Sequence, residues 1–105
     1  MRNLSTKNIG KENIDKLNKL CNKYKVSKLY LFGSARSKNF NKNSDLDFIV
    51  TFKDIDKDDY FDNYYDFKFS LIDALNRKID LLEEKAIRNP FLKISIDNSK
   101  EKIYG

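Results

Sequence analysis

Histidine and tryptophan are absent from this chain of 105 residues, and cysteine and proline occur once each. A single cysteine cannot form an internal disulfide, and a chain without histidine has neither a Cys/His zinc cluster nor an imidazole base for serine or cysteine catalysis. No stretch approaches 18 uninterrupted apolar residues, and residues 1–7 lack the apolar run of a signal peptide. We therefore expect a cytoplasmic protein without membrane contact, whose chemistry depends on carboxylates, lysines, hydroxyls or a metal held by oxygen.

The composition of the chain indicates one small basic domain. Hydrophobic residues make up 40% of the chain and aromatic residues 13%, which supports one core in a chain too short for two. We expect a single domain over residues 1–105. Lys and Arg number 21 against 16 Asp and Glu, a net charge of +5 that is spread along the chain. This excess favours polyanionic ligands only weakly, and the base composition of the source genome explains it equally well.

Hydrophobic periodicity divides the chain into helices and short strands. The expected order is a helix over Lys11–Lys25, strands over Leu29–Phe32 and Asp45–Phe52, a helix over Asp59–Asn76, a strand over Lys78–Glu83, and a short helix with an edge strand within Phe91–Tyr104. The second and third strands are separated by roughly 25 residues, the length of a right-handed parallel crossover. The fold class is therefore α/β (α+β), a small mixed β-sheet flanked by helices.

Two aromatic rows share the long helix. We expect the first row, which recurs at spacings of three and four, to supply much of the core; it consists of Phe61, Tyr65, Phe69, Ile72 and Leu75. A second row of Tyr60, Tyr64 and Phe67 exceeds what one stripe needs. We interpret it as core as well, with a partner surface as the alternative. Cys21 on the first helix is expected to be a small core residue and not a reactive thiol.

Acidic side chains occupy one face of the second and third strands. Asp45 and Asp47 stand two residues apart, so both side chains point to the same face. If the first strand runs antiparallel to the second, Gly33 at its end lies beside this pair and beside Asp80. Carboxylates at this spacing can bridge divalent ions, and the alternative is an ordinary solvated strand face. The acidic face continues with the apolar Ile49, which favours a metal or catalytic site.

The segment after the first strand suits a phosphate. Gly33 ends an apolar strand, and Ser34 can cap a short helix, which leaves unpaired backbone N–H groups pointing at a common spot. A Gly-Ser turn alone often ends a strand. Beside three carboxylates it completes a nucleoside triphosphate site, because phosphoryl-type transfer requires positioning and charge neutralisation by metal ions. Arg36, Lys38 and Lys42 lie in the same loop and carry charge for the triphosphate, with Arg36 the best candidate.

These motifs carry a family resemblance. Leu31-Phe32-Gly33-Ser34, followed after ten residues by Asp45-Leu46-Asp47 and then Phe48-Ile49-Val50, resembles the GS-x10-DxD signature of the DNA polymerase β-like nucleotidyltransferase superfamily. The small size and the order of elements resemble, more narrowly, the minimal nucleotidyltransferases, which are antitoxins paired with HEPN ribonuclease toxins. The resemblance covers residues 11–105, including the tail.

The resemblance implies a fold, a site and a reaction. The fold would be that of the polymerase β-like nucleotidyltransferases. Gly33 and Ser34 would hold the nucleotide phosphates, and Asp45 and Asp47 would bind Mg²⁺, with two ions in the site. Asp80 would complete one metal site and help to deprotonate the attacking hydroxyl. The reaction would transfer AMP from ATP to a tyrosine of the cognate HEPN toxin, with pyrophosphate leaving.

Two other functions stay open at this point. The chain could be a non-catalytic antitoxin with a vestigial nucleotide site that neutralises its partner by binding alone. It could also be a subunit of a nucleotidyltransferase that acts on a small molecule or a nucleic acid. No second domain for recognising an acceptor is evident in the sequence, so we expect another protein to bring the acceptor and expect no direct nucleic-acid binding.

Overall fold

The computed structural model describes residues 9–32 and 45–105 of the chain. The elements in these ranges are α2 (Lys11–Lys23), β1 (Val26–Phe32), β2 (Leu46–Phe52), α3 (Lys57–Leu75), β3 (Ile79–Glu83), the 3₁₀ turn η2 (Glu84–Ala86), α4 (Pro90–Ser99) and β4 (Glu101–Tyr104). Each predicted helix and strand is confirmed, with ends that differ from the prediction by up to three residues. None of the described helices is both long and apolar enough to cross a membrane.

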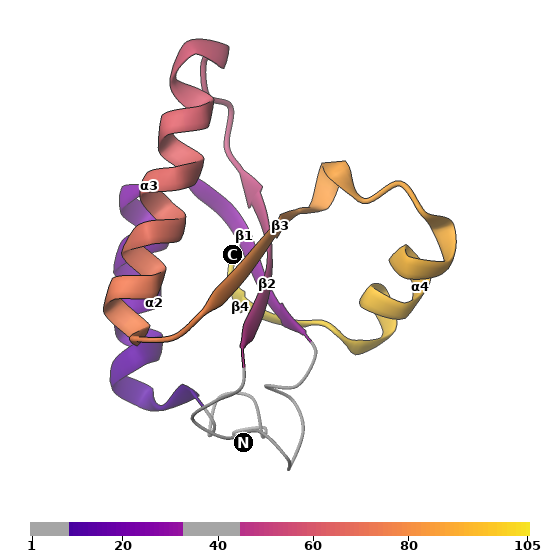
Figure 1. Ribbon diagram of the computed structural model, residues 1–105, viewed down its shortest axis with the longest axis horizontal. Helices are drawn as coiled ribbons and strands as arrows, with labels where there is room; N and C mark the ends of the chain where they lie inside the picture. The colour runs from indigo at the N-terminus through magenta and orange to yellow at the C-terminus, as the bar shows by residue number, and fades with distance from the viewer. Residues whose placement is uncertain (1–8, 33–44) are drawn as a thin grey trace.

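The four described strands form one mixed sheet in the order β3-β2-β1-β4 (Figure 1). β2 pairs with β3 in parallel, joined by the crossover helix α3, and β1 pairs antiparallel with both β2 and β4. The predicted parallel crossover and the predicted antiparallel pairing of the first two strands are thus confirmed. The fold class is α+β, as the sequence indicates.

Helices cover the two faces of the sheet unequally. Figure 1 shows α2 and α3 together on one side of the sheet and α4 on the other. The main hydrophobic core lies under α2 and α3; its fully buried members include Leu17, Cys21, Leu31, Phe48 and Phe67. The prediction of Cys21 as a core residue is confirmed, and burial raises the pKa of its thiol to about 12.

The expected core face of α3 is wrong for three of its five residues. Phe61 and Phe69 are 68% and 61% exposed, and Tyr65 is exposed as well. The buried stripe contains Phe67, Leu71 and Leu75, flanked by the half-buried Tyr64. Both stripes are aromatic at helical spacing, so hydropathy could not choose between them.

Hydrogen bonds to β3 explain the orientation of α3. The hydroxyl of Tyr64 donates to the backbone carbonyl of Leu81 at 2.5 Å, and the hydroxyl of Tyr60 donates to the carboxylate of Glu83. Phenylalanines in these positions would leave both acceptors without these donors. Phe67 is fully buried and Tyr64 packs against the core, as expected, whereas the half-buried Tyr60 lies at the edge of the core. The alternative of a partner surface is wrong for Phe67.

The other face of the sheet carries a small apolar contact layer near α4. Ile49 of β2 and Ile96 of α4 are both buried, yet neither belongs to the main core. The side chain of Asn89 caps α4 by accepting from the N–H groups of Phe91 and Leu92, and Pro90 occupies its first turn. The face is partly open along β1, where Lys28 is exposed and Tyr30 and Phe32 are half-buried.

Candidate active site

Strand pairing brings the predicted carboxylates to one end of the sheet. Asp47 of β2 and Asp80 of β3 are Cα partners in the parallel register, and Asp45 immediately precedes β2. A hydrogen bond of 3.1 Å from the Leu46 N–H to the Lys78 carbonyl fixes the start of this register. The sequence prediction that the three aspartates converge is therefore met by the backbone.

The turn after α3 positions the third carboxylate. α3 ends at Asn76, which adopts a left-handed conformation with φ 53°, and asparagine tolerates this region better than most residues. The chain then enters β3 at Ile79, directly before Asp80. The parallel pairing with β2 leaves Asp80 exposed and Asp47 half-buried at the same level of the sheet.

The negative charges of both Asp80 and Asp45 act on the carboxylate of Asp47. The pKa of Asp47 is raised above its ordinary value, first because burial disfavours the charged carboxylate and then because the negative charges of Asp80 and Asp45 lie close by. Both causes oppose the ionisation of Asp47. A positive charge placed among these carboxylates would reverse that effect.

The oxygen donors of this site suit magnesium, although their side chains are not arranged as a finished metal centre. Within residues 9–32 and 45–105, no group of three His, Cys, Asp or Glu side chains is gathered closely enough to hold a metal ion. The negative charges of Asp80 and Asp45 nevertheless act on Asp47. Carboxylates alone form a hard-oxygen donor set, which is the type that Mg²⁺ prefers. The residues therefore fit the expected metal by their chemistry.

The phosphate-binding half of the site falls in residues 33–44, outside the described part of the chain. The predictions for Gly33, Ser34 and Arg36, and for the loop lysines Lys38 and Lys42, lie in that segment. The described structure does show where the segment begins. Phe32, the last residue of β1, is the Cα partner of Asp47. Gly33 follows in the sequence, so the chain leaves the sheet beside the carboxylates.

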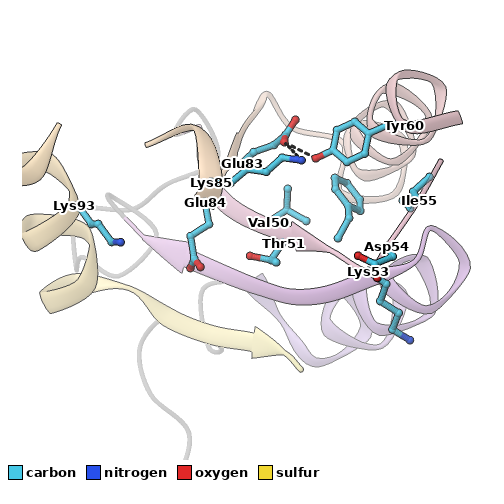
Figure 2. Close-up of a pocket in the computed structure, with 11 residues that line it drawn as sticks. Val50, Thr51, Lys53, Asp54, Ile55, Tyr60, Glu83, Glu84, Lys85 and Lys93 are labelled. Atoms are coloured by element: carbon cyan, nitrogen blue, oxygen red, sulfur yellow. Dashed lines mark hydrogen bonds and ion pairs between the residues drawn. The ribbon is translucent and has the colours of Figure 1, made fainter. Parts of the chain in front are cut away.

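A second polar region lies at the carboxyl end of β3 and was not anticipated from the sequence. It borders a cavity of about 390 Å³ whose lining includes Thr51, Tyr60, Glu83, Lys85 and Lys93 (Figure 2). The Lys85 ammonium lies 4.2 Å from the centre of the Tyr60 ring and 3.8 Å from the Glu83 carboxylate. Burial, followed by the hydrogen bond to Glu83, raises the pKa of Tyr60. Tyr60, Glu83 and Lys85 contact one another, which gives these three residues a structural role and leaves the carboxylate end as the candidate active site.

Comparison of sequences places nearly the whole chain in one family. The family model described as the nucleotidyltransferase domain matches residues 14–103. A candidate protein adenylyltransferase of Methanocaldococcus jannaschii is 38% identical over 80 residues, covering 74% of this chain and 77% of that protein.

Solved structures with the same fold include two toxin–antitoxin complexes. A minimal nucleotidyltransferase aligns with a TM-score of 0.72 at 20% identity, over 95% of both chains. A toxin–antitoxin crystal structure with AMP-PNP contains a chain that aligns with a TM-score of 0.69 at 25% identity, covering 89% of this chain and 73% of that one. A chain from the complex of a tri-AMPylated Shewanella oneidensis HEPN toxin with MNT antitoxin aligns with a TM-score of 0.62 at 24% identity, over 90% and 71%.

Proposed function

This chain belongs to the nucleotidyltransferase domain family and is a nucleotidyltransferase, and we propose that it transfers AMP from ATP to a tyrosine of a cognate HEPN toxin and acts as the antitoxin. The observation that carries the proposal is the parallel register of Asp47 and Asp80 beside the end of β1. The antiparallel pairing of Phe32 with Asp47 ends β1 beside the DxD half of the GS-x10-DxD signature, and Gly33 follows Phe32 in the sequence. The AMP-PNP complex and the AMPylated toxin complex among the structural relatives support the choice of nucleotide and acceptor.

In the proposed reaction the tyrosine oxygen of the toxin attacks the α-phosphorus of ATP. A bond forms between these two atoms, the bond from the α-phosphorus to the oxygen that bridges it to the β-phosphorus breaks, and pyrophosphate leaves. Asp80 accepts the proton of the attacking hydroxyl. Gly33 and Ser34 would hold the phosphates, and Arg36 would add a positive charge there. The product is a toxin that carries AMP on its tyrosine.

Asp45, Asp47 and Asp80 would hold two Mg²⁺ ions. When bound, Mg²⁺ supplies positive charge to the triphosphate and to the developing negative charge of the transition state. The aspartates also serve as negatively charged ligands whose mutual repulsion is relieved by the cation. The raised pKa of Asp47 is the structural sign of that repulsion and of partial burial.

Position-specific labels of ATP test the proposal. The chain is incubated with Mg²⁺, its cognate HEPN toxin and ATP labelled in either the α- or the γ-phosphate. We expect the α-label to move onto the toxin and the γ-label to leave as pyrophosphate. Asp80→Asn should transfer no label, whereas Asp54→Asn, at an exposed aspartate after the opposite end of β2, should transfer it normally.

The same experiment separates the competing functions. Inhibition of the toxin without label would indicate an antitoxin that works by binding alone. Label in a nucleic-acid or small-molecule fraction, with an unlabelled toxin, would indicate another acceptor. A γ-label on the toxin would indicate phosphorylation and would overturn adenylyl transfer.

A separate binding measurement tests the phosphate-binding role of the glycine and serine. The double variant Gly33→Val with Ser34→Ala should lose affinity for ATP with Mg²⁺, because the valine side chain occupies the space through which a phosphate approaches the backbone. Isothermal titration calorimetry on the folded variant measures the loss. Unchanged affinity would remove the phosphate role from these two residues.

A further inference from the structure

The outer face of α3 carries an exposed aromatic row made of Phe61, Tyr65 and Phe69. Phe61 and Phe69 are 68% and 61% exposed, and Tyr65 is 38% exposed. The ring centroids of Phe61 and Tyr65 lie 4.8 Å apart, and those of Tyr65 and Phe69 lie 6.1 Å apart. The three rings therefore form one continuous apolar surface. Clustered exposed aromatic residues of this kind are typical of protein contact sites.

A groove extends this aromatic row toward α2. It has a volume of about 390 Å³ and is lined in part by Phe69, Ile72, Asp66 and Asp73. Its polar lining also includes Ser70, whose hydroxyl is hydrogen-bonded to the Tyr24 hydroxyl at 3.0 Å. An apolar ring at the edge of a groove that holds two carboxylates suits the stem and the charged head of an arginine or lysine.

The charge of α3 differs in sign from that of the whole chain. The helix contains five aspartates and two lysines, a net charge of −3 in a chain whose total is +5. All five aspartates are exposed; they are Asp58, Asp59, Asp62, Asp66 and Asp73. A second copy packed through the same face would bring two acidic helices together, and a nucleic acid or an anionic membrane would be repelled. The negative charge of α3 therefore favours a protein partner with a basic surface.

We propose that the outer face of α3 is the docking surface for the acceptor protein, which contacts the aromatic row with apolar side chains and the aspartates with lysine or arginine. The inference rests on the proposed function for the identity of the acceptor. The row belongs to the side of α3 that faces away from the sheet, so docking and catalysis use different side chains. The C-terminal end of α3 leads directly to Asp80, which connects the docking helix to the active site along the chain.

Binding of purified cognate HEPN toxin, measured by biolayer interferometry without ATP, tests the docking surface. Phe61→Ser with Phe69→Ser should weaken binding at least tenfold. Phe91→Ser is the matched control, because Phe91 is an 82% exposed phenylalanine on α4, on the opposite side of the sheet; it should change binding less than twofold. Asp80→Asn should bind the toxin like the wild type while transferring no label, which separates docking from catalysis.

A charge-reversal variant provides an independent measurement on the same surface. Asp62→Lys with Asp66→Lys changes only exposed positions. It should weaken binding to the toxin at least tenfold and flatten the decrease in affinity that the wild type shows between low and high salt. If the melting curve shows that the phenylalanine double variant does not fold, the charge-reversal variant alone tests whether the outer face of α3 binds the toxin.

Four results would overturn the docking proposal. They are unchanged toxin binding by both double variants, equal weakening by Phe91→Ser, absence of any toxin binding by the wild type, and a dimer of the chain alone that the phenylalanine variant dissociates. Transfer of label by a variant that still binds normally would leave the proposed function intact and reject only this surface. If the wild type binds the toxin and both double variants weaken that binding, but no label is transferred, the docking surface stands and the proposed adenylyl transfer is rejected.

Discussion

The tyrosines of α3 and the aspartates at the start of β2 and β3 are two sets of polar side chains held by the same sheet. Tyr60 donates to Glu83, and Tyr64 donates to the backbone of β3, so each hydroxyl meets an acceptor. Asp47 instead stands beside Asp80, and the two like charges oppose each other. The first set strengthens the fold, whereas in the second set burial and neighbouring negative charges disfavour the ionised form of Asp47.

The difference indicates which set serves a ligand. A fold gains nothing from placing like charges side by side, and packing alone would favour complementary partners, as at Tyr60 and Glu83. Unfavourable local electrostatics are found where a site is arranged for a bound species. The comparison therefore attributes a stabilising role to the tyrosines and supports the proposal that the aspartates bind a ligand. It makes opposite predictions for conservative substitutions in the two sets.

The largest effect on stability is expected for Tyr64→Phe. The substitution removes the donor to the Leu81 carbonyl and leaves a partly buried acceptor without it, which lowers the free energy of unfolding by about 1–3 kcal/mol. Denaturant unfolding followed by circular dichroism measures this loss. Tyr65→Phe, one position along on the exposed row, should stay within about 0.5 kcal/mol of the wild type. Equal stability of the two variants would break the comparison.

The same neighbouring positions show where sequence reasoning succeeded and failed. The strands could be predicted because alternation and apolar runs reflect burial directly, and the spacing of Asp45 and Asp47 required a common face. The phase of α3 could not be predicted. Its two aromatic rows have similar hydropathy, and the choice between them depends on acceptors in β3, which follows α3 in the chain and meets it only in the folded sheet.

The candidate site was predictable to a similar depth. Strand order and the crossover length bring Asp80 beside Asp47, and both are readable from the sequence. The cluster of Tyr60, Glu83 and Lys85 could not be predicted from the sequence, because a tyrosine, a glutamate and a lysine at these spacings form no motif. Only the geometry of α3 against β3 brings them together.

Replacing an aspartate at the carboxylate end by asparagine should change the stability in the opposite direction to Tyr64→Phe. In the presence of a chelator, Asp45→Asn and Asp80→Asn should melt at or above the wild-type temperature, because each removes like-charge repulsion of up to about 1 kcal/mol near a surface. Both variants should also lose the stabilisation that ATP with Mg²⁺ gives the wild type, about 1.4 kcal/mol at a ligand concentration ten times Kd. Differential scanning calorimetry measures both effects. A clear fall in the melting temperature of either variant in chelator would make that aspartate a structural residue.

The smallest effect is the pH dependence caused by Asp47. Its pKa is raised in the folded state by burial and by the neighbouring carboxylates, whereas in the unfolded chain it titrates near pH 3.9. Between these two pKa values the folded protein binds more protons, so stability falls as the pH rises from below about 4 through the folded pKa and is then constant. Solvent screens this partly exposed group, so we expect a contribution of only a few tenths of a kcal/mol.

The contribution of Asp47 is isolated by the difference between the wild type and Asp47→Asn. All other carboxylates titrate in both proteins. The free energies of unfolding of the two proteins are measured in chelator from pH 3 to 7, and the wild type should lose stability relative to Asp47→Asn as the pH rises. Tyr60 and Tyr64, whose pKa values are also raised, do not interfere, because tyrosines ionise in the unfolded chain only near pH 10. A difference that moved in favour of the wild type would mean that a partner stabilises the Asp47 carboxylate. The aspartates would then resemble the paired tyrosines, and the contrast between the two sets would be lost.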